Sequence, residues 1–173
     1  MNYRPTAAVS LEKWLDRRSG GERIWGMAKD AKIKVKSVHR YNVSAELIFD
    51  TLMDPNKAKK FMFATLTGKM IKAEIEPKAG GMFVFVDRRP DGDAPHYGLY
   101  SVVERPKHIV FQFSVQKDMA EADQVSIDIL QLKQGSEVTL THEMKADFAH
   151  LRDRVQEGWD GILDGLGEAL RKN

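Results

Sequence analysis

Histidines and aromatic residues are the side chains of this sequence whose spacing is compatible with a binding site. His96 and Tyr100 lie four residues apart in the segment HYGLYSVVE. If this segment is a strand, alternation places both side chains on one face, where they could orient a ligand or transfer a proton. Because hydrogen-bonded structural histidines are commoner than catalytic ones, we interpret the pair as polar anchors for a ligand and assign no catalytic residue.

Alternating phenylalanines supply the apolar part of the candidate site. The segments MFVFVD and HIVFQFSV each carry two phenylalanines in alternation, and the last helical segment carries a tryptophan and a leucine four residues apart. A fully packed core explains such residues as well as a cavity does. The predicted ligand-binding residues are Phe83, Phe85, His96, Tyr100, Phe111, Phe113, Trp159 and Leu163.

Other reactive motifs are incomplete. HEMKA begins at His142 like a zinc-protease helix, but Ala146 stands where the second histidine should be. His142 instead shares a strand face with Val138 and Leu140, which indicates a core position. DGDAP does not continue to the glutamate that completes a calcium loop, and the sequence has no cysteine. We therefore expect no metal site and no cofactor.

Composition limits the class of protein. The 173 residues are 42% hydrophobic and 30% charged, a balance typical of one globular domain with a sizeable core. The sequence contains no run of about 18 apolar residues and no N-terminal segment of signal-peptide type. A soluble cytoplasmic protein that does not enter a membrane is predicted. The net charge of +2 is too small to indicate nucleic-acid binding.

Residues 1–31 are predicted to form a basic helical extension. In SLEKWLDRRSGG, Ser10 is a helix cap, and Leu11, Trp14 and Leu15 share one face. The excess of lysine and arginine is either a solvated surface or a contact for an acidic partner. The apolar face predicts partial docking, or a contact in a homodimer or with another protein.

Residues 32–173 are predicted to form an α+β domain. KIKVKSVHRYNV alternates as a half-buried strand, and SAELIFDTLMD and NKAKKFMF predict two short helices separated by Pro55. From Met70 to Met144, six alternating segments are separated by turn signals, which predicts an antiparallel meander. Together, the first strand and these six segments are predicted to form a curved antiparallel sheet of about seven strands.

The C-terminal segment has helical periodicity and one apolar stripe. Only this helix is long enough to cover the concave face of a curved sheet. Gly158, Gly161 and Gly165 flank the stripe, although glycine weakens a helix. We expect these glycines to permit close approach to the sheet, or to leave room for something held between helix and sheet.

Five blocks carry a family resemblance: SAELIFDTLMDPNKAKKFMF, AGGMFVFVD, HYGLYSVVERPKHIVFQFS, VTLTH and EGWDGILDGL. In this order they resemble the bacterial proteins similar to the C-terminal domain of the activator of the heat shock protein 90 ATPase. These proteins belong to the START-like (SRPBCC) helix-grip superfamily, with the birch-pollen allergen and polyketide cyclases. The resemblance extends from about Lys32 to Leu170. Phe61, Met62 and Phe63 depart from it, because many relatives carry tryptophan there, and this departure is expected to alter a pocket wall.

The resemblance implies a helix-grip fold with a cavity between the sheet and the long C-terminal helix. It does not imply a reaction, since one fold serves many functions. Binding of a small apolar or aromatic molecule by the residues named above is the main prediction. A cyclase- or hydrolase-type enzyme in the same cavity, and a chaperone-partner module resembling the ATPase activator, are the alternatives.

Overall fold

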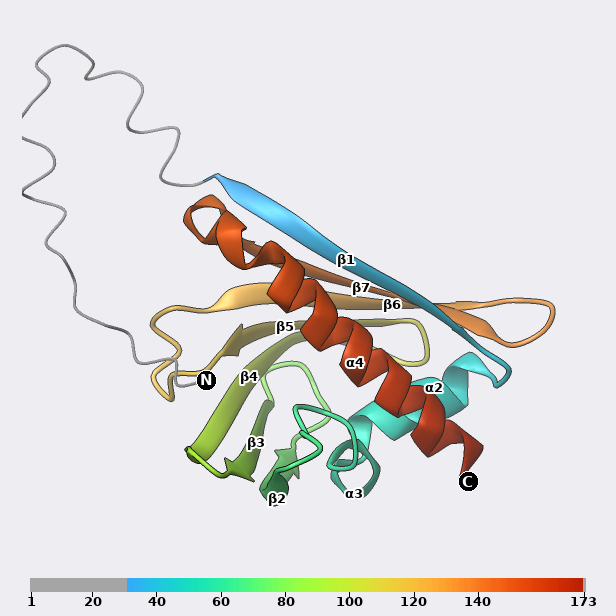
Figure 1. The fold of residues 1–173 in the computed structure, drawn as a ribbon. Helices are drawn as coiled ribbons and strands as arrows, with labels where there is room; N and C mark the ends of the chain where they lie inside the picture. Colours follow the sequence, from blue (N-terminus) through green and yellow to red (C-terminus); the bar gives the residue numbers. More distant parts are fainter. Residues whose placement is uncertain (1–30, 173) are drawn as a thin grey trace, which may run out of the picture. The chain divides into compact units, whose positions relative to one another are not determined.

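In the computed structural model, which describes residues 31–172, the strands lie where alternating hydrophobicity predicts them. They are β1 (Lys32–Tyr41), β2 (Lys69–Ile75), β3 (Met82–Arg89), β4 (Gly92–Glu104), β5 (His108–Ser114), β6 (Asp123–Gln131) and β7 (Ser136–Lys145). Every neighbouring pair is antiparallel, in the order β1-β7-β6-β5-β4-β3-β2 (Figure 1). The helical extension predicted for residues 1–31, and the contacts proposed for it, fall on residues that apart from Ala31 lie outside the described range.

Two short helices, α2 (Ala45–Met53) and α3 (Pro55–Ala58), follow β1. The Ser44 hydroxyl caps α2 by accepting a hydrogen bond from the Leu47 backbone N–H at 3.3 Å. Proline at the first position of α3 costs no helical hydrogen bond. The helix is shorter than the predicted NKAKKFMF segment, because all three side chains of Phe61–Phe63 are buried and Phe63 has a φ of 57°. One face of a helix cannot bury three consecutive residues.

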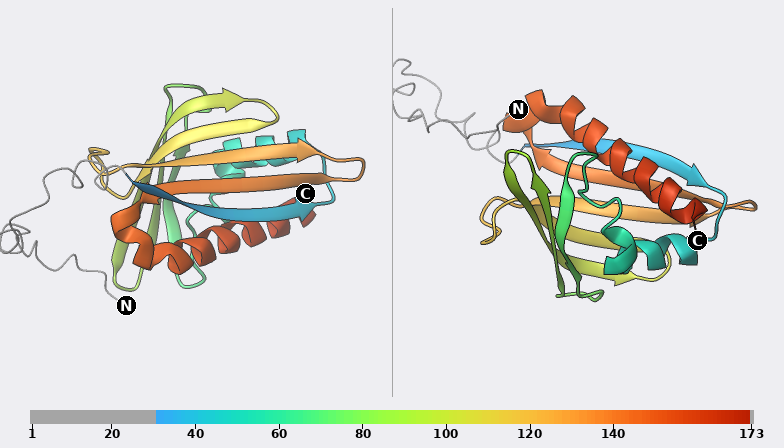
Figure 2. Two further views of the ribbon diagram at one scale, coloured as in Figure 1. Left: turned by 90° about the horizontal axis from the view of Figure 1, so that it is seen from above. Right: turned by 60° about the horizontal axis from the view of Figure 1, so that its bottom comes forward.

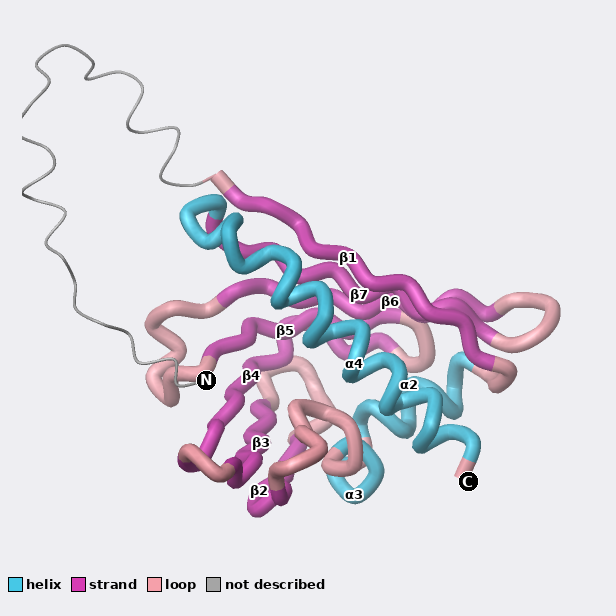
Figure 3. Tube along the Cα trace, in the orientation of Figure 1, coloured by secondary structure: helices cyan, strands magenta, loops and turns pink. Residues whose placement is uncertain are grey.

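The longest helix, α4 (Arg152–Arg171), follows a 3₁₀ segment, η3 (Ala146–Leu151), and lies along the concave side of the sheet (Figures 2 and 3). Several hydrogen bonds attach α4 to β1. The Tyr41 hydroxyl donates to the Leu163 carbonyl at 2.8 Å, and the Gln156 amide donates to the Lys36 carbonyl at 2.8 Å. The residues that α4 buries in the core are Trp159, Leu163, Leu166 and Leu170. Within residues 31–172, no helix has the length and apolar character needed to cross a membrane.

The glycines of α4 differ in what they face. A Cβ at Gly165 would lie 2.8 Å from the Phe61 Cβ, and one at Gly167 would lie 3.3 Å from the Tyr41 ring. A Cβ at Gly158 or Gly161 would meet nothing within 4 Å. The expected close approach is therefore found in the C-terminal half of α4. The expectation of close approach is wrong for Gly158 and Gly161, because both are exposed.

Alanine substitutions in α4 should separate these two environments. Gly158→Ala and Gly161→Ala are each expected to raise the free energy of unfolding by about 0.5 to 1 kcal/mol, because alanine favours the helix and has space. Gly165→Ala is expected to lower it, because overpacking costs about 1 to 3 kcal/mol. Urea unfolding of the three variants measures the change in the free energy of unfolding, which is expected to be positive at Gly158 and Gly161 and negative at Gly165. Equal stabilisation by all three would contradict the contact between Gly165 and Phe61.

Candidate functional site

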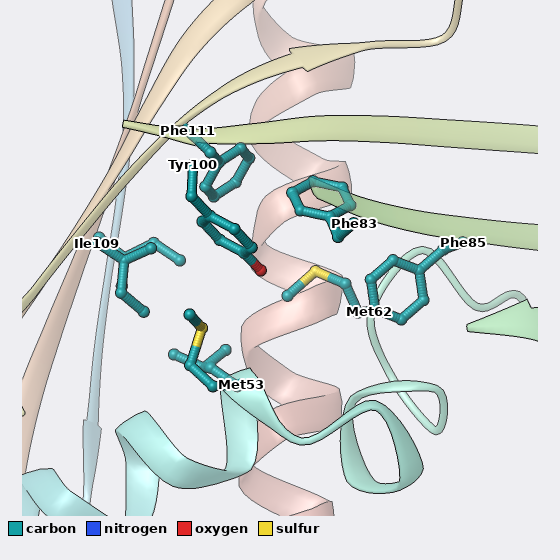
Figure 4. Close-up of a pocket in the computed structure, with 9 residues that line it drawn as sticks. Met53, Met62, Phe83, Phe85, Tyr100, Ile109 and Phe111 are labelled. Carbon is teal, nitrogen blue, oxygen red and sulfur yellow. The ribbon is translucent and has the colours of Figure 1, made fainter. Parts of the chain in front are cut away.

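Among residues 31–172, an inner and an outer space lie between the helices and the concave face of the sheet. The inner space has a volume of about 20 Å³ and the outer one about 350 Å³. The inner space is lined by Leu52, Met53, Met62, Phe83, Phe85, Tyr100, Ile109, Phe111 and Ile127 (Figure 4). The outer cavity is lined by Phe63, Ala64, Thr65, Arg89, His96, Phe113, His142, Arg154, Val155, Gly158, Trp159 and Ile162.

The structure distributes the predicted site residues over both spaces. Those at the outer cavity are His96, Phe113 and Trp159. Those at the inner space are Phe83, Phe85, Tyr100 and Phe111. Leu163 is 1% exposed in the core and lines neither space. The two proposed polar anchors, His96 and Tyr100, are thus in different spaces.

A single aromatic ring separates His96 from Tyr100. Both residues lie on one face of β4, with Gly98 between them. A Cβ at Gly98 would lie 1.9 Å from the Phe83 ring, so this ring from β3 occupies the position that a side chain at Gly98 would take. The glycine allows the close approach, and Phe83 lies between the two polar residues on the inner-space side.

The inner space is part of the packed core. A volume of about 20 Å³ holds about one water molecule. The Tyr100 hydroxyl points toward Met53 and Met62 (Figure 4), and burial raises the pKa of this hydroxyl well above its ordinary range. A molecule larger than water does not fit here without rearrangement of the surrounding side chains.

Near-parallel rings form one wall of the outer cavity. The Phe63 ring stacks on His96 with centroids 4.4 Å apart and planes at 7°, and on Phe113 at 5.2 Å and 8°. The Trp159 ring meets Phe63 edge-on at 5.8 Å and 65°. These are the favoured geometries of aromatic pairs. Phe63 is not among the residues assigned to the site from the sequence, although the FMF segment was expected to alter a pocket wall.

A chain of hydrogen bonds fixes Trp159 in the cavity wall. The Trp159 indole N–H donates to His142 Nδ1 at 2.9 Å, and His142 Nε2 lies 3.0 Å from a carboxylate oxygen of Asp123. Because an indole nitrogen only donates, Nδ1 must accept, so the proton of the neutral imidazole is on Nε2 and points to Asp123. Both nitrogens of His142 are used. The residue therefore positions Trp159, consistent with its predicted core position.

A buried carboxylate holds Arg89 and the Phe63–Gly68 loop at the cavity. Asp87 is 0% exposed and accepts hydrogen bonds from the Thr65 hydroxyl at 2.7 Å and from Arg89 Nε at 3.1 Å. Together with Phe83 and Phe85, Asp87 and Arg89 occupy alternate positions of β3. The alternating pattern of β3 could therefore have indicated Asp87 and Arg89 as site residues, because charged side chains at inward-facing positions of a strand signal a functional site.

His96 is held neutral at the cavity wall. Burial, and next the positive charge of Arg89, lower the pKa of His96 from 6.5 to about 4. Its Nδ1 atom is buried and has no hydrogen-bond partner among the described residues. Within residues 31–172, no three histidine, aspartate or glutamate side chains gather as a metal site.

Solved structures with this fold come from several bacteria. An X-ray structure from Nitrosomonas europaea has a TM-score of 0.70 and 18% identity, covering 81% of this chain and 95% of its own. The solution structure of an AHSA1-like protein from Aeromonas hydrophila has a TM-score of 0.70 and 19% identity, covering 81% and 93%. A Staphylococcus aureus protein of unknown function has a TM-score of 0.69 and 13% identity, covering 82% and 95%. No curated protein matches the chain significantly in sequence.

These likenesses establish the helix-grip fold, in which a curved antiparallel sheet covers a long C-terminal helix. The family model described as Activator of Hsp90 ATPase homolog 1-like protein matches residues 42–171. This match includes α2, both spaces under the sheet and all of α4. The chain therefore belongs to the family of Activator of Hsp90 ATPase homolog 1-like proteins.

Proposed function

We propose that the protein binds a small aromatic or apolar molecule in the outer cavity, between α4 and the sheet. The observation that carries this proposal is the wall of near-parallel rings formed by Phe63, His96 and Phe113, with Trp159 edge-on. The volume of about 350 Å³ lies within the range of about 300 to 1,000 Å³ typical of ligand sites. A cytoplasmic location is part of the proposal.

Blocking the cavity from α4 tests this function. Gly158 lines the outer cavity and Gly161 does not, yet both are exposed and have space for a side chain. Gly158→Leu is therefore expected to weaken binding at least tenfold, and Gly161→Leu to leave it unchanged. The indole N–H signal of Trp159, identified by its loss in Trp159→Phe, reports binding in a nuclear magnetic resonance titration with naphthalene and indole derivatives.

Saturable shifts of the Trp159 signal that disappear in Gly158→Leu and persist in Gly161→Leu are the expected result. Native mass spectrometry of the purified protein would then identify a co-purified molecule. If a chemically diverse panel leaves the signal unmoved, or if both leucine variants bind like the wild type, the cavity is not the binding site.

The family description supports a second candidate, a module that stimulates a chaperone ATPase. In that case the protein would raise the ATPase rate of a bacterial Hsp90, and Gly158→Leu would not reduce the effect. An enzyme in the same cavity is the remaining alternative, with His96 as the proton-transferring group. Turnover of a co-purified molecule that is lost in His96→Phe would favour it.

A further inference from the structure

The charged residues at the outer cavity are all cationic. Arg89 and Arg154 line it, together with two histidines, and no aspartate or glutamate is among its lining residues. Asp87 and Asp123, the carboxylates that hydrogen-bond to the lining residues Arg89 and His142, do not themselves line the cavity. The surface that a ligand meets is therefore apolar and positively charged.

Arg89 retains donors for a ligand. Its contact with Asp87 uses Nε only, and the terminal Nη groups have no hydrogen-bond partner among the described residues. The Arg89 side chain is 33% exposed, whereas that of Asp87 is 1% exposed. Since the guanidinium is a fork of five N–H donors, the bond to Asp87 orients the group and leaves its outer edge to the cavity.

Arg154 supplies a charge that is not engaged in an ion pair within the described chain. It lies near the start of α4, is exposed, and forms no ion pair within residues 31–172. Arginine binds carboxylates with two parallel hydrogen bonds. Asp87 balances Arg89, so the cavity has one positive charge in excess, which Arg154 provides.

The apolar wall limits the shape of the body that such an anion can carry. The rings of His96 and Phe113 are tilted by only 15° from each other, and both are nearly parallel to Phe63. Trp159 meets Phe113 at 68°. Parallel stacked rings with a perpendicular ring beside them favour a planar ring system over a branched chain, since offset-stacked and edge-to-face contacts are then both available.

We propose, resting on the function proposed above, that the ligand is a planar aromatic carboxylate whose acid group pairs with Arg154 and the outer edge of Arg89. The ring lies against Phe63 and Phe113. Recognition of this kind is selective, because a neutral analogue of the same shape leaves the charged donors without their partner.

Isothermal titration of the full-length protein with 2-naphthoate and 2-naphthamide tests the proposal, because the two compounds share size and ring and differ in charge. We expect 2-naphthoate to bind about tenfold or more tightly than the amide, in line with the strength of charge-assisted hydrogen bonds. Arg154→Gln should remove most of this preference. Arg152→Gln is the matched control, because Arg152 is exposed on the same helix and does not line the cavity.

The outcomes separate the two proposals. If the amide binds as tightly as the acid or more tightly, and Gly158→Leu abolishes its binding, the cavity binds ligands and the acid inference is overturned. A preference for the acid that Arg154→Gln leaves intact, or that Arg152→Gln removes equally, overturns the assignment to Arg154. If neither compound binds the wild type, this inference fails, and if the wider panel also leaves Trp159 unmoved, the proposed function fails with it.

Discussion

Phe111→Ala is expected to lower the free energy of unfolding by about 3 to 5 kcal/mol and to leave binding in the outer cavity unchanged. The Phe111 side chain is 3% exposed, and its ring lies 5.1 Å from the Phe83 ring and 6.0 Å from the Tyr100 ring. It lines only the inner space. Truncation therefore opens a void in a packed core. Urea unfolding and a titration with 2-naphthoate measure the two effects.

Phe113→Ala is the matched comparison, because Phe113 alternates with Phe111 on β5 and lines the outer cavity. It is only half-buried, so its removal should destabilise the protein less and weaken binding more. A loss of binding in Phe111→Ala at a protein concentration and temperature where the variant is folded would show that the inner space and the outer cavity are coupled. Equal destabilisation by both variants would contradict the distinction between core and cavity.

The fold could be predicted because its signals are local. In β7, Val138, Leu140 and His142 face the core and the residues between them are more exposed, which is the period of two that the sequence displays. Turn residues then mark the strand ends, and only one helix remains to cover the concave face. None of these steps requires knowledge of which distant side chains touch.

The division of the space under the sheet could not be predicted in the same way. Alternation correctly places Phe83, His96 and Tyr100 on the inward face, but it does not show that Gly98 leaves room for the Phe83 ring between the other two. The position of Phe63 likewise depends on a backbone with a φ of 57°, which is uncommon outside glycine. Contacts between strands and loops decide both features.

The helical-wheel pattern wrongly predicted close approach to the sheet at Gly158, for a related reason. It gives the direction of a residue around the helix axis, but not the distance from the helix to its neighbours at each turn. Phe61 and Tyr41 approach α4 at Gly165 and Gly167, whereas nothing lies within 4 Å of a Cβ at Gly158. The alternative expectation, that a glycine leaves room for something between helix and sheet, agrees with the place of Gly158 in the cavity lining.

Acid is expected to destabilise the wild type more than a His96→Phe variant. The pKa of His96 is lowered to about 4 in the folded protein, from 6.5. Between these values the unfolded chain binds a proton at this residue and the folded protein does not. The free energy of unfolding therefore falls as the pH decreases from about 6.5 to 4, by about 3 kcal/mol in total. Below pH 4 both states are protonated, and this contribution no longer changes.

Urea unfolding between pH 7 and pH 4 measures the difference, with His96→Phe beside the wild type. Phenylalanine keeps a ring against Phe63 and cannot titrate, so the variant should lose about 3 kcal/mol less across this interval. All other titratable groups are the same in both proteins, so their contributions cancel in the comparison. Parallel pH profiles for the wild type and His96→Phe would mean that His96 accepts a proton in the folded protein, and hence that the cavity wall is hydrated around it.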